Sequence, residues 1–175
     1  EINIPENQII PGNYLLTLWS PSSKDSIKVN FKIDWFDMPV SLRSPDFAIE
    51  AMYYILNDDE FKEYRSGSRK DLFLKILKYW KIQDPTPETH YNESMAEYFR
   101  RVDYASLNFG TFTQKNGVKT DKGKIYILYG NPSSIKQSYE NDVNTEIWKY
   151  DNLKKEFIFV AESSNNFLLK KVIEK

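Results

Sequence analysis

The side chains of this 175-residue chain that could do acid–base or binding chemistry are carboxylates, lysines, arginines and tyrosines. The chain has no cysteine and a single histidine, His90. Thiolate catalysis, disulfides and metal sites built from several cysteines or histidines are therefore excluded. No glycine-rich phosphate loop, nucleophile elbow or zinc-binding spacing occurs, so we expect neither a cofactor nor a metal.

Several charged and polar residues cluster around the end of one predicted helix and the loop after it. As a candidate binding set we take Arg100, Arg101, Thr120, Asp121 and Lys122. The two arginines are adjacent on a helix, so their side chains diverge by about 100°. We expect one to face solvent and the other the sheet, where burial would require a carboxylate partner.

A structural polar network is the alternative use of the same region. Its predicted members are Asp84, Arg101, Asp121 and Glu146. Thr120 and Asp121 have a simpler interpretation as residues that bond backbone amides in a tight turn. A pairing of Asp121 with Arg101 or Arg100, and a catalytic Asp121, remain open beside it.

Two further features have structural and functional interpretations. The segment 84–87, Asp-Pro-Thr-Pro, either ends a helix and caps the next one or forms a ligand loop. His90 then falls in the first turn of the next helix, where we expect it to be exposed.

The 12 Tyr, 11 Phe and 4 Trp residues are numerous enough to fill a core, and a carbohydrate or peptide groove is the other possibility. The formal net charge of −1 gives no electrostatic case for nucleic acid or an anionic membrane.

The periodicity of apolar residues predicts an α+β chain. Residues 13–35 alternate as a β-hairpin, which we interpret as the remnant of an upstream β-sandwich. Helical spacing follows around 45–64, 69–82 and 88–107, and 110–123 reads as a polar loop. Residues 124–129 predict a central strand, 133–144 have no clear pattern, and 146–150, 156–161 and 167–173 predict further strands. We expect about three helices packed on a small antiparallel sheet, with domains at 1–40 and 41–175.

Blocks of residues from Trp80 onward give the chain a family resemblance. They are Trp80 with 84–87, then Tyr98 (or Phe99), Arg100, Arg101, Val102, Tyr104 and Ala105, then 117–121, Gly-Val-Lys-Thr-Asp, then 122–132, 146–150 and 157–160. Over about 70–172 the chain resembles the GWxTD domain family, with Val118 in place of the motif tryptophan. The resemblance implies a module of a bacterial exported or envelope multidomain protein, located in the periplasm or elsewhere outside the cytoplasm, and implies no catalytic residues.

Two functions remain open from the sequence. We expect a non-enzymatic interaction or scaffold module whose partner is another envelope protein or an upstream domain of the same chain. Its candidate surface is the loop 110–123 with the helix face of Arg100 and Arg101. The alternative is a carboxylate-based hydrolase acting on a glycan or peptide, with Asp84, Asp121 or Glu146 as acid or base. No run of 18 apolar residues is present, so we expect no transmembrane helix.

Overall fold

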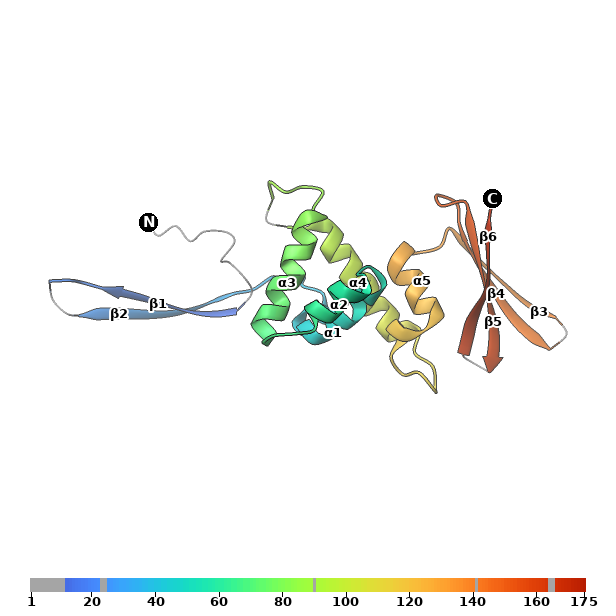
Figure 1. Cartoon of the computed structure of the whole chain (residues 1–175), viewed down its shortest axis with the longest axis horizontal. Helices are drawn as coiled ribbons and strands as arrows, with labels where there is room; N and C mark the ends of the chain where they lie inside the picture. Colours follow the sequence, from blue (N-terminus) through green and yellow to red (C-terminus); the bar gives the residue numbers. More distant parts are fainter. Residues whose placement is uncertain (1–11, 23–24, 90, 141, 164–165) are drawn as a thin grey trace. The chain divides into compact units, whose positions relative to one another are not determined.

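The computed structural model describes residues 12–22, 25–89, 91–140, 142–163 and 166–175. His90 lies outside the described residues, so its predicted exposure stays a prediction. The chain divides into two compact units between Met38 and Pro39, and the ribbon in Figure 1 is coloured along the sequence through both. That the first unit derives from a β-sandwich also stays a prediction.

The first unit contains the predicted β-hairpin. Strands β1 (Gly12–Trp19) and β2 (Ser26–Ile33) pair antiparallel, with Tyr14 opposite Phe31 and Leu16 opposite Val29. Because side chains alternate between the two faces of a strand, these pairs share one face. The Tyr14 and Phe31 rings stack with centroids 5.5 Å apart. Much of this apolar face is exposed within the hairpin, including Ile27 at 65%.

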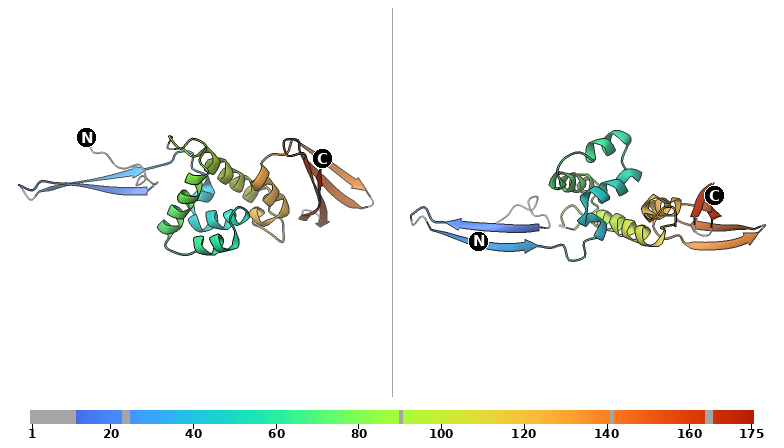
Figure 2. Two further views of the ribbon diagram at one scale, coloured as in Figure 1. Left: turned by 45° about the horizontal axis from the view of Figure 1, so that its top comes forward. Right: turned by 90° about the horizontal axis from the view of Figure 1, so that it is seen from below.

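The second unit begins with helices and ends with a sheet (Figures 1 and 2). Its α-helices are α1 (Pro45–Ala51), α2 (Asp58–Tyr64), α3 (Arg69–Ile82), α4 (Glu93–Asn108) and α5 (Asp121–Tyr129). Short 3-10 helices are η2 (Val40–Arg43), η3 (Met52–Tyr54) and η4 (Gly117–Lys119). The strands are β3 (Ser134–Glu140), β4 (Val143–Tyr150), β5 (Lys155–Ser163) and β6 (Asn166–Glu174).

Local sequence signals set the starts of several helices. Ser68 and Asp71 form the predicted box at the start of α3, where each side chain bonds the backbone amide of the other. Asn57 and Glu60 do the same for α2, a signal that our sequence reading missed. Helix α3 ends at Ile82, just before the Asp-Pro-Thr-Pro segment, as predicted. Helix α4 starts at Glu93 behind Asn92, later than the expected position near 88.

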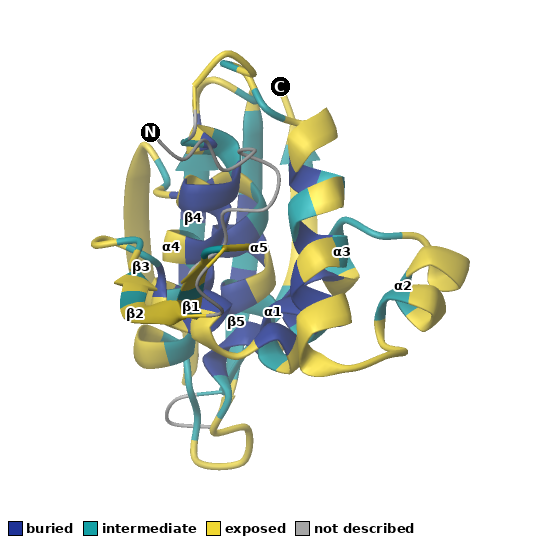
Figure 3. Ribbon diagram, turned by 90° about the vertical axis from the view of Figure 1, so that its left-hand side faces the viewer, coloured by how far each residue is buried: buried dark blue, intermediate teal, exposed yellow. Residues whose placement is uncertain are grey.

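Helix α4 is the centre of the helical core, and its buried face is the predicted one. That face consists of Met95, Tyr98, Phe99, Val102 and Ala105, together with Ala96. The Tyr98 hydroxyl donates to the Ala51 carbonyl at 2.7 Å. The Asp103 carboxylate accepts from the backbone amides of Val40 and Ser41 at 2.6 and 2.8 Å. Elements η2, α1, α3 and α4 all contribute buried residues, and Figure 3 colours the ribbon by burial.

The predicted central strand at 124–129 is wrong, because these residues form most of α5. Ile125, Tyr126 and Ile127 are consecutive and all buried, which mimics a strand covered on both faces. Ile125 and Tyr126 pack on the sheet, while Tyr126 also stacks on Tyr104 of α4 at 4.5 Å. The run 125–128 is apolar at four consecutive positions, so periodicity cannot tell this part of a short helix from a buried strand.

The four strands form one antiparallel sheet in the order β3–β4–β5–β6. The turn at 151–154 and strands β4, β5 and β6 agree with the sequence prediction. Strand β3 does not, because its seven residues are all exposed and carry no apolar alternation. One face of the sheet packs on α5 through Trp148, Tyr150, Phe157 and Phe159. The abundant strand aromatics of the second unit therefore fill a core.

The chain is thus α+β, with antiparallel sheets of two and four strands. The expectation of about three helices on one sheet needs correction, because the described residues contain five α-helices. Helix α5 is the one whose buried side chains join the sheet core, and the core residues of α1, α3 and α4 pack among helices. Among the described helices, none combines the length and the apolar character that crossing a membrane requires.

Candidate functional site

Residues 117–121 form a corner between α4 and α5. Asn116 starts η4 by accepting from the amide of Val118 at 3.1 Å. Thr120 then caps α5, since its hydroxyl oxygen accepts from the Gly123 amide at 3.0 Å and its hydroxyl donates to the Gly117 carbonyl at 2.8 Å. The simpler interpretation of Thr120 as a backbone-bonding turn residue agrees with this geometry. The predicted polar loop is correspondingly shorter, because η4 and α5 occupy its second half.

Close backbone contacts explain why positions 117 and 123 are glycine. A Cβ atom at Gly117 would lie 2.0 Å from the Ala105 carbonyl oxygen of α4. A Cβ atom at Gly123 would lie 1.9 Å from the Gly117 carbonyl oxygen. Real Cβ atoms do not approach backbone oxygens so closely, so both positions require glycine. The corner is therefore held tightly against the end of α4 and the start of α5.

Asp121 ties the corner to the sheet instead of to an arginine. Its Oδ2 atom accepts from the Leu169 amide of β6 at 2.7 Å. Strand β6 is an edge of the sheet, and its pairing with β5 shifts register between Ile158 and Phe159. A shifted edge strand leaves backbone amides without ladder partners. Asp121 thus supplies an acceptor to β6 while its negative charge lies favourably at the N-terminus of α5.

Val118, which stands at the motif tryptophan position, is a core residue. Its side chain is 3% exposed, and its carbonyl accepts from the Tyr54 hydroxyl at 2.8 Å. Burial, together with the nearby charge of Asp121, raises the pKa of Tyr54. At this corner the chain therefore uses Val118 for packing.

Lys122 and Glu146 form an ion pair between α5 and the sheet. Lys122 Nζ lies 2.9 Å from Glu146 Oε2, and the two side chains are only 15% and 8% exposed. Gln137 Nε2 also donates to Oε2, at 3.1 Å, and Trp148 Nε1 donates to Oε1. The ammonium group of Lys122 is 3.5 Å from the centre of the Phe167 ring. All polar atoms of this buried pair thus meet partners, which is what burial of charge requires.

The surroundings shift the pKa of both members of this pair. Burial lowers the pKa of the Lys122 amine, against the opposing effect of the Glu146 carboxylate. Burial by itself would raise the pKa of Glu146, but the hydrogen bonds from Trp148 and Lys122, with the Lys122 charge and Gln137, outweigh it and lower the pKa. The lowered pKa of Glu146 favours its charged form, and the Glu146 carboxylate in turn favours the charged form of Lys122 against burial.

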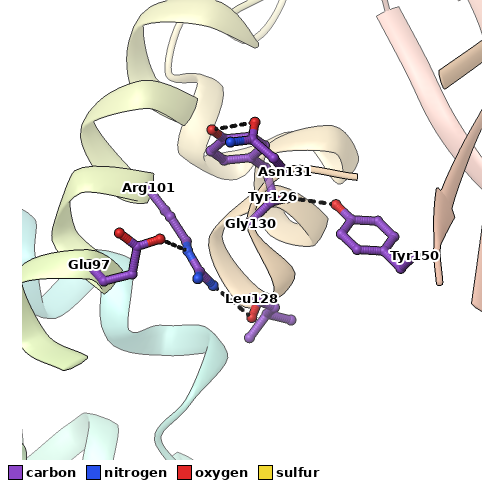
Figure 4. Close-up of polar contacts among 7 residues, drawn as sticks. All are labelled: Glu97, Arg101, Tyr126, Leu128, Gly130, Asn131 and Tyr150. Atoms are coloured by element: carbon purple, nitrogen blue, oxygen red, sulfur yellow. Dashed lines mark hydrogen bonds and ion pairs between the residues drawn. The ribbon is translucent and has the colours of Figure 1, made fainter. Parts of the chain in front are cut away.

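Arg101 lies against the C-terminal end of α5 (Figure 4). Its Nε donates to Glu97 Oε1 at 2.7 Å, and its Nη1 donates to the Leu128 carbonyl at 3.4 Å. A Cβ atom at Gly130 would lie 3.0 Å from the guanidinium carbon. A cation is favourable beside the unpaired carbonyls of a helix C-terminus. Arg101 therefore joins α4 to α5. Its carboxylate partner is Glu97, one turn earlier on α4.

Arg100 diverges from Arg101 and lies on an exposed stripe of α4. Its Nη2 donates to the Tyr91 hydroxyl at 2.9 Å. Tyr104 and Leu107 follow at four and seven residues, so they share this face. Tyr104 is 44% exposed and Leu107 84%. In the loop beyond α4, Phe112 is 97% exposed, between Thr111 and Gln114, which bond to each other.

Asp84 has a local role in the described residues. Its Oδ1 accepts from the Thr86 amide at 3.0 Å, and Thr86 Oγ1 donates to Glu93 Oε2 at 2.6 Å. These bonds shape the turn between α3 and α4. The segment therefore ends α3 as predicted. The predicted cap of the next helix is wrong, because Asn92 caps α4 and residues 84–87 lie in the turn before it.

The structure does not join the four residues of the predicted polar network into one cluster. Within the described ranges, Asp84, Arg101, Asp121 and Glu146 each bond a different set of partners. The partners that sequence reasoning missed are Glu97, Gln137 and Leu169. Only Glu97 carried a usable signal, because it precedes Arg101 by four residues on one helix. No cluster of three or more carboxylate or histidine side chains that could hold a metal occurs in the described part of the chain.

Comparison with known proteins gives one match. The sequence model of the family described as GWxTD domain matches residues 13–173, nearly the whole chain. The match extends the resemblance, which we saw over about 70–172, through α1 and α2 to the β1–β2 hairpin. No curated protein and no solved structure matches the chain.

Proposed function

The chain belongs to the GWxTD domain family, and on that premise we propose that it is a non-enzymatic binding or scaffold module. Its setting is an exported or envelope-associated bacterial protein with several domains, outside the cytoplasm. Its partner is another envelope protein or a domain of the same protein. The compartment and the setting come from what the family resemblance implies.

The observation that carries the proposal is a set of exposed large side chains at the end of α4 and in the loop after it. Leu107 is 84% exposed and Phe112 97%, and Arg100 and Tyr104 extend the same helix face. We call these four residues the α4 surface. Large aromatic, arginine and aliphatic side chains are the groups that dominate protein interfaces. The loop that carries Phe112 is ordered by its own bonds, so presenting this ring costs little conformational entropy on binding.

The bonding of the candidate carboxylates supports binding over hydrolysis. Asp84 and Asp121 accept from backbone amides, and Glu146 is paired with Lys122. A glycosidase needs two carboxyl groups that face one substrate site about 5 to 9.5 Å apart. Each of these three carboxylates is bonded within the fold, and this is why we favour the binding module over the hydrolase.

The absence of cysteine allows a direct test of compartment and surface together. Phe112→Cys in the full-length protein should react with a membrane-impermeant maleimide in intact cells whose outer layer has been permeabilised. Ala48→Cys, at a position with 0% exposure, is the matched unreactive control. Labelling of Phe112→Cys only after lysis would contradict an extracytoplasmic module.

A second test addresses the partner. A photoreactive amino acid at position 112 should give a discrete crosslinked product in cells, and the same group at Tyr139, 70% exposed on β3, should not. The double variant Leu107→Ser with Phe112→Ser should lose the partner without loss of folding. Ile82→Ser, at a site 78% exposed on α3, should retain it. Equal crosslinking at positions 112 and 139 would contradict the α4 surface.

A further inference from the structure

Asn116 and Gly117 form the only Asn–Gly pair in the sequence of 175 residues. In such a pair the backbone nitrogen of the glycine can attack the side-chain carbonyl carbon of the asparagine, which is the first step of deamidation. Glycine hinders this attack least, because it has no Cβ atom and its backbone rotates freely. Asn116 is the cap of η4, so the pair lies where the chain enters the corner formed by residues 117–121. The corner therefore contains a peptide bond with a reactivity of its own.

The folded corner keeps the two reacting atoms apart. The ψ angle of Asn116 is 102°, which turns the Gly117 nitrogen away from the Asn116 side chain about the Cα–C bond. Attack requires rotation about that bond until the nitrogen lies over Cβ. The rotation would carry the Asn116 carbonyl away from the Lys119 amide, which donates to it at 3.0 Å. The Oδ1 atom of Asn116 also accepts from the Val118 amide at 3.1 Å, so the side chain is held as well.

Packing around Gly117 opposes the same rotation. Gly117 is buried, and a Cβ atom there would lie 2.0 Å from the Ala105 carbonyl oxygen and 2.8 Å from the Gly110 nitrogen. Its own carbonyl accepts from the Thr120 hydroxyl at 2.8 Å. The peptide between Asn116 and Gly117 can therefore turn only when the corner separates from α4. Proteins open locally in this way at a lower free energy than global unfolding requires.

We propose that Asn116 is a deamidation site that is blocked in the closed corner and reacts when the corner separates from α4. In the open corner the Gly117 nitrogen loses its proton to a hydroxide ion and bonds to Cγ of Asn116. The Cγ–Nδ2 bond breaks, and Nδ2 leaves as ammonia after taking a proton from water. The product is a cyclic succinimide, which water opens to aspartate or isoaspartate. Water and hydroxide are the only co-reactants, and nothing is oxidised or reduced.

The two products differ in whether the corner can close again. Aspartate at position 116 leaves the backbone unchanged and keeps an acceptor oxygen for the Val118 amide. Isoaspartate routes the backbone through Cβ and Cγ, which adds a methylene group before Gly117 and takes the carbonyl that the Lys119 amide uses out of the main chain. The close contacts of Gly117 with Ala105 and Gly110 leave no room for the longer backbone. Isoaspartate formation thus makes a transient opening of the corner permanent.

The deamidation rate of the whole chain tests whether the closed corner blocks the reaction. Peptide mapping by mass spectrometry follows the loss of ammonia at Asn116 in mildly alkaline buffer, for the folded chain and for the same chain in urea. The folded chain should react about 10-fold or more slowly, because an opening step must come first. Equal rates in the two states would overturn the proposal.

Three variants separate opening of the corner from global unfolding. Gly123→Ala, whose Cβ atom would lie 1.9 Å from the Gly117 carbonyl oxygen, should speed deamidation of the folded chain. Asp121→Ala, which releases α5 from the Leu169 amide, is a milder variant that should act in the same direction. Ile76→Val, at a position with 0% exposure, lowers stability away from the corner and is the matched control, which should leave the rate unchanged. The same acceleration in all three variants, or no acceleration in the two corner variants, would overturn the proposal.

The purified isoaspartate form tests the consequence for the fold. It should melt at a lower temperature than the fresh chain, because its corner stays open. Asn116→Asp, which has the same charge and an unchanged backbone, should melt close to the fresh chain. Equal melting temperatures for the isoaspartate form and the fresh chain would show that the corner closes over the longer backbone, and would overturn the permanent opening.

Discussion

Asp121 and Leu169 are 48 residues apart in the sequence, and a 2.7 Å hydrogen bond joins the Asp121 carboxylate to the Leu169 backbone amide. The bond fixes the first turn of α5 to the edge strand β6. The following residue, Lys122, reaches the sheet through Glu146. The motif corner therefore connects the helices of the second unit to its sheet through two consecutive side chains.

Replacing Asp121 should loosen this connection. We expect Asp121→Ala to lower the free energy of unfolding by about 1–3 kcal/mol, because the Leu169 amide loses a charged acceptor. Asp121→Asn, which keeps an acceptor oxygen, should cost less. Urea unfolding followed by tryptophan fluorescence measures both, with Glu162→Ala as the exposed control. Equal stability of Asp121→Ala and the control would show that the bond is not needed.

Gly123→Ala should destabilise the chain, although helix propensity alone would predict that it stabilises α5. Alanine normally stabilises a helix by about 1 kcal/mol relative to glycine. At Gly123, which lies in α5, a Cβ atom would meet the Gly117 carbonyl oxygen at 1.9 Å. We therefore expect Gly123→Ala to destabilise the chain by about 2 kcal/mol or more, as overpacking and strain do. A rise in melting temperature for this variant would contradict the close packing of the corner.

The Lys122–Glu146 pair should be costly to break on one side only. Lys122→Met leaves the Glu146 carboxylate buried without its cation, and we expect a loss of about 3–5 kcal/mol. The double variant Lys122→Met with Glu146→Gln should recover much of that loss, because no buried charge remains. Chemical unfolding of the two single variants and the double variant measures the coupling. Strict additivity of the two single effects would contradict a direct interaction.

The stabilisation that Glu146 contributes to the folded chain should be lost at low pH. Its pKa is lowered in the folded state from the ordinary value of 4.5, so the unfolded chain binds the proton more readily. The stabilisation is then fully present above pH 4.5 and is lost as the pH falls through the lower folded pKa. The stability gap between the unchanged chain and Glu146→Gln should narrow as pH falls below about 4.5. A gap that stays constant down to pH 2 would contradict this.

The second unit should fold without the hairpin. The chain divides between Met38 and Pro39 into two compact units, and a lone two-stranded hairpin is at best marginally stable in water. We expect residues 39–175 to unfold cooperatively with a melting temperature within about 4 °C of the whole chain, roughly the shift that 1 kcal/mol produces in a domain of this size. Circular dichroism and calorimetry measure this. Loss of cooperative unfolding would show that the hairpin is part of one folding unit.

Sequence reasoning did well where short-range chemistry decides structure. The Ser68 and Asp71 side chains cap α3 because each lies within reach of the other's amide. The alternation in β1 and β2 put Tyr14 and Phe31 on one face, and the helical spacing in α4 identified its buried residues. Thr120 bonds a nearby backbone amide, as predicted, but the prediction placed it in a tight turn before a strand and the structure places it at the start of α5. Such features need no knowledge of distant segments.

The partners of the charged side chains could not be predicted from the sequence. The sequence alone left Arg101 with several possible carboxylates, and the fold pairs it with Glu97. It left Asp121 between a backbone amide and an arginine, and the fold places β6 beside it. Long-range pairs depend on which segments meet in space, and no local pattern encodes that meeting.

The family, the α+β class, the antiparallel strands and the starts of α1 and α3 were determined by the sequence itself, because they rest on periodicity and on bonds within one turn. Tertiary structure alone decided that residues 124–129 are a helix, that 134–140 pair as an edge strand, and that Lys122 is buried against Glu146. The physical reason is shared: a short apolar run has no preferred state until neighbours cover it, and an exposed edge strand or a buried charge is stabilised only by partners far along the chain.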